Sequence, residues 1–162
     1  MGAVLRMTVG GKTVTHDLER FSRNGQNMGP ALAKVAQIQV DAVRDQFRTQ
    51  GQHYGQRWAP LSPGYKMQKL RSKPGRPTLV YTGKLKKHAA PVRAENGGVY
   101  RLTGKRVEVG YMDSQVPYGK YHMNGGGNLP ARPFMGEPTR KDQKAMVKEV
   151  HQWLVNGLEV LR

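Results

Sequence analysis

The chain has 162 residues, 37% of them apolar, and its 27 Lys and Arg against 11 Asp and Glu give a net charge of +16. This length suits one domain with a moderate core, and the absence of cysteine excludes disulfides, thiolate zinc sites and a cysteine nucleophile. Residues 44–106 hold 15 basic and 2 acidic side chains, so +13 of the +16 lies there. Such a field attracts nucleic acid or an acidic protein neighbour.

The amino-terminal sequence and the hydropathy pattern indicate neither export nor a membrane partner. Residues 1–10 lack the long apolar core and the small-residue cleavage site of a signal peptide. No apolar run approaches the roughly 20 residues that a membrane-spanning helix needs. We therefore expect the chain to fold in a reducing cytoplasm.

A β-hairpin is predicted for residues 1–20. Apolar and polar side chains alternate over residues 3–9, Gly10 and Gly11 tolerate the positive φ of a tight turn, and residues 13–18 return. The free edge of such a hairpin is able to add to the sheet of a neighbouring subunit.

The segment 29–50 contains the first long helix, predicted over residues 29–48. Pro30 suits its first turn, and Gly51 follows its end. Apolar side chains cover a wide arc of this helix, so we expect other elements to pack on more than one side of it. These side chains are Ala31, Leu32, Val35, Ala36, Ile38, Val40, Ala42, Val43 and Phe47.

Residues 51–80 show little regular pattern apart from a turn around Trp58. Ser62 is placed to cap a short helix that begins at Pro63, before further prolines and a glycine interrupt the chain. A basic loop over residues 66–77 is expected to be mobile. Four residues are expected to fix the turn that leaves the first long helix: Trp58, Pro60, Leu61 and Pro63.

Residues 81–136 are predicted to hold a short helix, a small sheet and a glycine-rich tip. Thr82 is placed to cap the helix over 82–90. The tip covers residues 124–128, and a rigid Pro-Ala-Arg-Pro-Phe piece follows at 130–134. Three strand-like pieces, joined by turns at Asn-Gly and Thr-Gly-Lys, suggest an antiparallel meander: residues 90–95, 97–104 and 105–112.

The carboxy-terminal segment 137–162 is predicted as a helix from Pro138 to Leu161. The order of elements predicts that the whole chain is one α+β domain, with a small antiparallel β-sheet packed against two long α-helices, a long basic loop and an N-terminal β-hairpin. The apolar face of the last helix consists of Val147, Val150, Leu154, Leu158 and Leu161.

No residue pattern in the chain points to an enzyme active site. No two of the five histidines have the i, i+4 spacing of a metal-binding helix, and the few acidic residues are scattered. Ser62 lacks the context of a nucleophile elbow, and no phosphate-loop Lys-Ser or Lys-Thr follows the glycines at 125–127. We therefore expect no catalysis, metal or cofactor; a nuclease or a peptidoglycan hydrolase is the enzymatic alternative that an activity screen would test.

Five short motifs occur in a fixed order: GQRWAPLSPGY at 55–65, YTGKL at 81–85, VEVG at 107–110, YGKYHMNG at 118–125 and PARPFMG at 130–136. In this order and spacing the chain resembles the phage virion morphogenesis family, the tail-completion or neck proteins of Mu-like tailed phages. The resemblance covers nearly the whole chain. The motif residues that carry it are Gly55, Trp58, Pro60, Leu61, Ser62, Lys69, Thr82, Gly83, Leu85, Tyr118, His122, Gly125, Pro130, Arg132, Pro133 and Phe134.

The resemblance implies a structural, non-enzymatic virion protein that joins tail to head. Such a protein forms a homo-oligomeric ring around the DNA channel at the head–tail junction, and it is assembled in the cytoplasm of the host bacterium. The implied partners are further copies of the chain, the tail tube or tail terminator protein, the head–tail connector on the portal side, and genomic DNA bound without sequence preference.

The basic residues would serve one of two roles in such a ring. They either line the channel and hold DNA through phosphate charge, or dock an acidic face of the tail tube or the connector. A freestanding nucleic-acid-binding or DNA-packaging accessory protein is the alternative, because it shares the charge although not the motifs. Arg132 either anchors the 130–134 corner by bidentate pairing or is a plain surface cation. The basic segment consists of Lys66, Lys69, Arg71, Lys73, Arg76, Lys84, Lys86 and Lys87.

Overall fold

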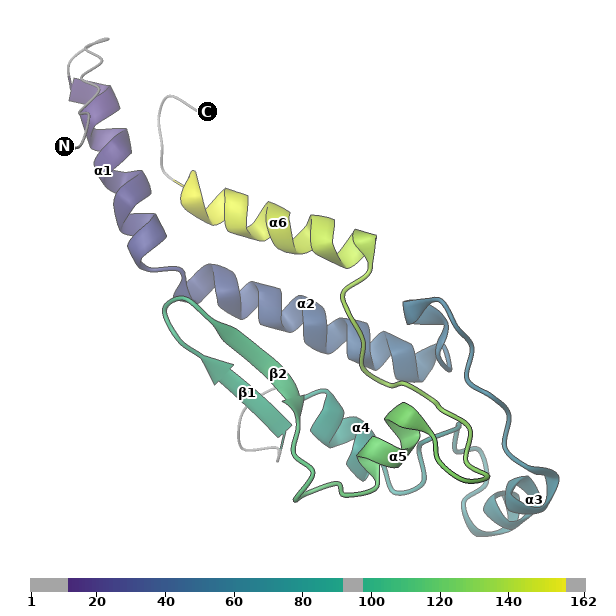
Figure 1. The fold of residues 1–162 in the computed structure, drawn as a ribbon. Coiled ribbons are helices and arrows are strands. Elements are labelled where there is room, and N and C mark those ends of the chain that lie inside the picture. The colour runs from purple at the N-terminus through teal and green to yellow at the C-terminus, as the bar shows by residue number, and fades with distance from the viewer. Residues whose placement is uncertain (1–11, 92–97, 157–162) are drawn as a thin grey trace.

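The computed structural model describes residues 12–91 and 98–156. Its elements are α1 (Lys12–Gln26), α2 (Gly29–Arg48), η1 (Gln52–Tyr54), α3 (Pro63–Ser72), α4 (Lys84–Ala89), β1 (Gly98–Leu102), β2 (Val107–Tyr111), α5 (Gly119–Asn124) and α6 (Arg140–Leu154). The prediction of a mixed α and β fold with a small antiparallel sheet is confirmed. In Figure 1, α2 runs through the middle of the molecule, with α6 along one side and the β1–β2 hairpin on the other.

Helix α2 agrees with its predicted bounds and is covered on several sides. Pro30 lies in its first turn, where the missing N–H leaves no helical bond unmade. Past its end, Gly51 takes a φ of +103° and donates its N–H to the Gln46 carbonyl at 2.9 Å, a left-handed ending that glycine permits. The side chains buried against α6, α4, η1 and both strands are Ala31, Ala36, Val40, Ala42, Val43, Gln46 and Phe47.

The predicted amino-terminal hairpin is wrong for the part that the structure describes. Residues 12–26 form α1, and residues 1–11, which include the predicted first strand and turn, lie outside the described residues. After Asp17 the alternation stops, and Leu18 and Phe21 stand three residues apart among Glu and Arg side chains. Long side chains at this spacing favour a helix, because residues three or four apart share one helical face.

The predicted three-stranded meander reduces to one hairpin among the described residues. Strands β1 and β2 pair antiparallel along their whole length. At their turn the Thr103 N–H donates to the Arg106 carbonyl at 2.8 Å, so the predicted Thr-Gly-Lys turn is confirmed. Ala90 and Pro91, the start of the predicted first strand, are buried after α4 without strand pairing, and the rest of that strand with its Asn-Gly turn lies outside the described residues.

Helix α6 begins within two residues of its predicted start but turns a different face to α2. Thr139 and Asp142 form a capping box, in which each side chain accepts the other residue's N–H, at 3.2 and 3.0 Å. Val147, assigned to the apolar face, is 67% exposed, whereas Val150 is half-buried. The helix ends at Leu154 and residues 155–156 form a turn, so the predicted continuation to Leu161 is wrong there; its part from residue 157 lies outside the described residues.

Three helices of 15 residues or more, rather than the predicted two, are present among the described residues: α1, α2 and α6. The Trp153 indole of α6 holds the corner between α1 and α2, because its Nε1 donates to the carbonyls of Asn24 and Asn27 at 3.0 and 2.9 Å. The predicted short helix from Pro63 is confirmed as α3, which also takes up residues 66–72 of the predicted basic loop. Only residues 73–77 of that loop lie outside a helix.

The core lies between α2, α4, the end of β2 and the segment around Phe134. Phe47 is central: its ring meets Trp58 edge to face with 5.4 Å between centroids, and lies 5.9 Å from Phe134. The core therefore joins the end of the first long helix to the piece before α6. Its buried apolar residues are Val40, Val43, Phe47, Trp58, Val80, Leu85, Ala89, Ala90, Val116 and Phe134.

Candidate functional site

Trp58 joins the end of α2 to the carboxy-terminal third of the chain. Its backbone N–H donates to the Gln50 carbonyl at 2.8 Å, and its indole Nε1 donates to the Pro133 carbonyl at 2.9 Å. Gly51 leaves room for the ring, because a Cβ there would lie 2.7 Å from Trp58 Cδ1. The side chain is only 6% exposed, so the turn is held by the core of the protein.

Arg132 anchors the 130–134 segment, which we call the strap. The residue is 3% exposed, so it is not a plain surface cation. Its Nε and Nη2 donate to the carbonyls of Ala59 and Pro60, both at 2.8 Å, so the bidentate anchor is made to backbone rather than to a carboxylate. Burial lowers the pKa of Arg132, and the nearby Tyr65 phenol acts in the opposite direction.

Gln46 completes the attachment of the strap, and sequence reasoning missed it. Its Nε2 donates to the Pro133 carbonyl at 2.8 Å, and its Oε1 accepts the Tyr54 N–H at 3.1 Å. The residue is 1% exposed. A polar side chain within the apolar stripe of α2 was the available signal, since buried polar groups need partners.

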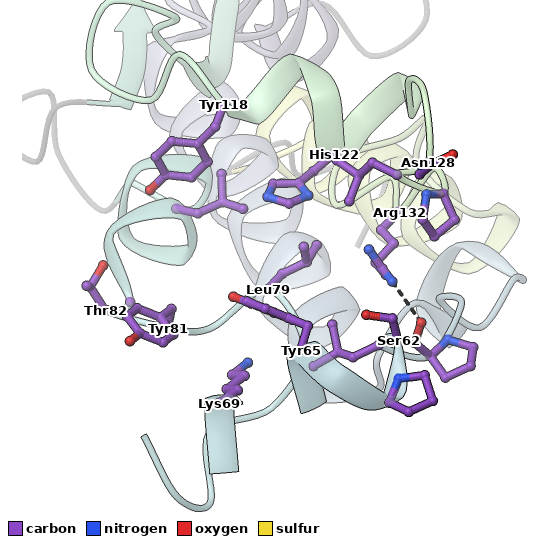
Figure 2. A pocket seen from close by; sticks show the side chains of 17 residues that line it. Ser62, Tyr65, Lys69, Leu79, Tyr81, Thr82, Tyr118, His122, Asn128 and Arg132 are labelled. Carbon is purple, nitrogen blue, oxygen red and sulfur yellow. Dashed lines mark hydrogen bonds between the residues drawn. The ribbon is translucent and has the colours of Figure 1, made fainter. Parts of the chain in front are cut away.

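A pocket of about 830 Å³ opens where α3, α4, α5 and the strap meet (Figure 2). We call it the motif pocket, because eleven of the sixteen motif residues line it. They are Pro60, Leu61, Ser62, Lys69, Thr82, Gly83, Leu85, Tyr118, His122, Pro130 and Arg132. Tyr65, Leu79 and Tyr81 also line it and were not predicted as site residues. Four separate motifs therefore contribute to one surface.

Lys69 corrects the prediction of a mobile, outward-facing cation. The residue is 5% exposed, and its Nζ donates to the Pro77 carbonyl at 2.6 Å. Burial lowers the pKa of its ammonium group. Lys69 thus closes the turn after α3 while lining the motif pocket.

His122 lines the motif pocket near Arg132 (Figure 2). Burial lowers the pKa of the imidazole, and the positive charge of Arg132 lowers it further. Its Nδ1 is buried and has no hydrogen-bond partner among the described residues. The imidazole therefore keeps a polar atom for which the described part of the chain supplies no partner.

The two residues predicted to cap helices, Ser62 and Thr82, lie next to the starts of α3 and α4 but do not act as the expected N-caps. Ser62 precedes α3 as predicted, but its side chain makes no capping hydrogen bond and instead lines the pocket. At α4 the residue before the helix is Gly83, with a φ of +85°, and the Thr82 hydroxyl accepts the Lys84 N–H at 3.3 Å.

The remaining motif residues shape the backbone and the core. Gly55 ends η1 with a φ of +92°. At Gly125 a Cβ would lie 2.9 Å from the Ala131 nitrogen, so the tip packs closely on the strap. The tip also closes on itself, because Gly126 and Leu129 exchange two backbone hydrogen bonds of 3.0 and 2.9 Å.

The basic segment lies on and around α3 and α4 and, Lys69 excepted, is exposed: Lys66, Arg71, Lys73, Arg76, Lys84, Lys86 and Lys87. Three of these residues border a second pocket of about 690 Å³ together with Arg57: Lys66, Lys73 and Arg76. The positive field read from the sequence is therefore carried by solvent-facing side chains next to the motif pocket.

A carboxylate at the start of α6 was also missed. Asp142 Oδ2 accepts from Thr139 Oγ1 at 2.6 Å and lies 2.9 Å from His53 Nε2. Although burial alone would raise the pKa of Asp142, these hydrogen bonds outweigh it and lower that pKa. Burial, followed by the charge of Asp142, raises the pKa of Tyr54 to about 12.

Neither a metal cluster nor a membrane span is found in the described part of the chain. No group of three or more His, Asp or Glu side chains could hold a metal ion there. No described helix is both long and apolar enough to cross a membrane.

The profile of the phage virion morphogenesis family matches residues 9–155. A protein of Methanocaldococcus jannaschii that is described only as uncharacterized is 33% identical over 117 residues, which cover 70% of this chain and 79% of that protein. No solved structure matches the chain. The matched range includes α1 to α6, the motif pocket, the Trp58 turn and the strap. The chain therefore belongs to the phage virion morphogenesis family.

Proposed function

We propose that this phage morphogenesis protein is a structural joint, a tail-completion or neck component that connects tail to head and carries out no chemistry. One observation carries the proposal: eleven motif residues from separate parts of the chain meet in one surface pocket. Two of them, Arg132 and Lys69, are buried and donate to backbone carbonyls. The exposed tyrosines beside these fixed polar groups suit the docking of a neighbouring protein.

The joint is proposed to work as a homo-oligomeric ring around the DNA channel. Head-to-tail contacts between identical subunits close into a ring when the rotation between them allows it. Partners on either side would be the tail tube or tail terminator protein and the head–tail connector. Leu18 and Phe21 of α1, which are 65% and 44% exposed, offer apolar surface for such contacts.

The exposed basic segment is proposed to face either the channel or an acidic neighbour. Cations on mobile side chains hold DNA through phosphate charge without sequence preference. Replacing Lys66, Arg71, Lys73 and Arg76 by Gln would then weaken DNA retention or head–tail joining. If both were unchanged, this role of the basic segment would be excluded.

A cryo-EM reconstruction of the virion neck tests the proposal directly. The expected result is density for this chain as a ring between head and tail, with Trp58 and the strap resolved and one face turned to the channel. A neck completely built from other proteins would overturn the proposal.

The second candidate is a non-specific nucleic-acid-binding or DNA-packaging accessory protein. The exposed cations around α3 and α4 favour it. It predicts that the isolated chain binds duplex DNA at least as tightly as any virion protein. Filter binding at two salt concentrations, set beside binding to purified tail and head proteins, separates the two candidates.

A further inference from the structure

The motif pocket contains two buried cations and no acid. Lys69 and Arg132 are 5% and 3% exposed. Within the described residues neither has an ion-pair partner, and the lining of the pocket contains no Asp or Glu. A cation withdrawn from water without an anion is unfavourable unless another group supplies the opposite charge.

Both cations keep hydrogen-bond donors for such a group. Arg132 uses Nε and Nη2 on backbone carbonyls, which leaves Nη1 without an acceptor in the described part of the chain. Lys69 uses one ammonium proton on the Pro77 carbonyl and has two more. A carboxylate accepts from guanidinium and ammonium donors with short, charge-assisted bonds.

The rest of the lining is apolar and aromatic. Tyr65, Tyr81 and Tyr118 are 45%, 42% and 40% exposed at the pocket. In Figure 2, Tyr65 and Leu79 lie between Lys69 and Arg132. Exposed tyrosines beside apolar side chains and separated charges are typical of surfaces that bind protein segments. The phosphates of a duplex would instead meet the exposed cations outside the pocket first.

We propose that the motif pocket binds a short segment of a neighbouring virion protein, with acidic side chains that pair with Lys69 and Arg132 and apolar side chains that lie against Leu79 and Tyr65. A neighbour other than a further copy of this chain is the expected source of the acidic side chains, because the chain itself has only 11 Asp and Glu against 27 Lys and Arg. The inference rests on the proposed function, which supplies the virion neighbour.

Two sets of end-capped pentapeptides on a membrane test the inference with the full chain as the probe. In the first set the outer positions are Asp or Glu and the three inner positions are Leu, Val or Phe; in the second set Asn or Gln replaces the acids. The expected result is retention of the chain by acidic peptides and little by their amide counterparts. Equal retention by both sets, or none by the acidic set, would overturn the inference.

Two lysine variants on α3 then locate the binding in solution. For the best acidic peptide, Lys69→Met should raise the Kd about tenfold or more, because a charge-assisted bond is lost. Lys66→Met removes the same charge one turn earlier from an exposed position, and it should change the Kd by less than about twofold. Equal effects of the two variants would mean attraction by the general field and would contradict the pocket.

The unaltered protein supplies a readout that does not depend on the folding of Lys69→Met. The ring nitrogen signals of His122 should shift when the acidic peptide is added and stay in place with the amide peptide. A short DNA duplex should not displace the peptide; full displacement would make the pocket a polyanion site and overturn the inference. Presence of the chain in the neck without peptide binding would refute only the inference, whereas peptide binding by a chain absent from the neck would refute only the proposed function.

Discussion

Several buried side chains attach separate segments of this protein by donating hydrogen bonds to the carbonyls of proline-rich segments. Trp58 and Gln46 donate to Pro133, Arg132 donates to Ala59 and Pro60, and Lys69 donates to Pro77. Proline has no N–H and such segments form no ladder, so their buried carbonyls need donors from side chains. The prolines thus explain why Gln46, Lys69 and Arg132 are buried polar residues, since each of them supplies a donor to such a carbonyl.

Trp58→Ala should cost about 3–5 kcal/mol of unfolding free energy, because it removes a buried aromatic ring and the donor to Pro133. Urea unfolding followed by the fluorescence of Trp153 measures the loss. Trp58→Phe is the control: it keeps most of the packing on Phe47 and should lose markedly less. Wild-type stability of the alanine variant would show that the turn is held by other residues.

Asp142 should make stability depend on acid pH. Because its pKa is lowered in the folded state, its contribution is present above the unfolded value of about 4 and is lost as the pH falls through the folded value. The unfolding free energy of the wild type should therefore drop more steeply below pH 4 than that of Asp142→Asn. Parallel acid profiles for the two proteins would contradict this account.

Tyr54 gives the matching prediction at alkaline pH. Its pKa is raised to about 12, so its contribution to stability is present below about pH 10 and is lost as the pH rises toward 12. Ultraviolet titration of the phenols should show a late step that Tyr54→Phe reduces and does not abolish, because burial and then the charge of Asp113 also raise the pKa of Tyr111. In Asp142→Asn the late step should move down only in part, because burial is the larger cause of the shift.

At the scale of elements, local patterns predicted α2, the short helices α3 and α4 and the β1–β2 hairpin, but they missed α1. The helical spacing of apolar side chains predicted α2. A proline or a small polar residue predicted the starts of α3, α4 and α6, because start signals of this kind act within one turn of a helix. The face of α6 was misjudged, since which side meets α2 depends on a distant partner. The alternation over residues 13–18 was too short to outweigh the helical residues after it.

Gly51→Ala tests the close approach of the Trp58 turn to the end of α2. The φ of +103° alone costs a side chain about 1–3 kcal/mol, and the new Cβ would also collide with Trp58 and the Gln56 carbonyl. Gly55→Ala is a matched control, because its φ is +92° but nothing lies within 4 Å of its Cβ. Thermal melting should show a larger decrease in Tm for Gly51→Ala than for Gly55→Ala. Equal decreases would refute the predicted collision of the new Cβ with Trp58 and the Gln56 carbonyl.

At the scale of the whole molecule, the motif pocket could not be located from the sequence. The five motifs could be recognised in the sequence as separate segments. That four of them line one pocket depends on how the strap folds back onto residues 58–60. Lys69 was expected among solvent-facing groups because charge normally marks the surface, and Arg132 was left open between an anchor and a surface cation. Only the fold shows that both are buried, and that Tyr65 and Tyr81 stand beside them.

The exposed cations around α3 should set the salt dependence of DNA binding by the whole chain. With Lys66, Arg71, Lys73 and Arg76 changed to Gln, the slope of log K against log salt should fall by about 0.9 for each lost phosphate contact. Four exposed cations of α6 provide the control: Arg140, Lys141, Lys144 and Lys148. Filter binding of both quadruple variants measures the slopes, and equal reductions would indicate net charge rather than a defined face.

Helix α2 has a mechanical consequence. Its 20 residues span about 30 Å at 1.5 Å per residue, and glycine and proline occur only at its start, so nothing within it acts as a hinge. The corner between α1 and α2, which Trp153 of α6 holds, lies at the beginning of α2, and the Trp58 turn lies at its end (Figure 1). A force applied between these two ends would be transmitted along α2 without bending it at a hinge. Two neighbouring proteins bound at opposite ends of α2 would therefore stay at a constant distance from each other. A ring of such subunits would change its inner diameter by tilting the subunits, not by stretching them.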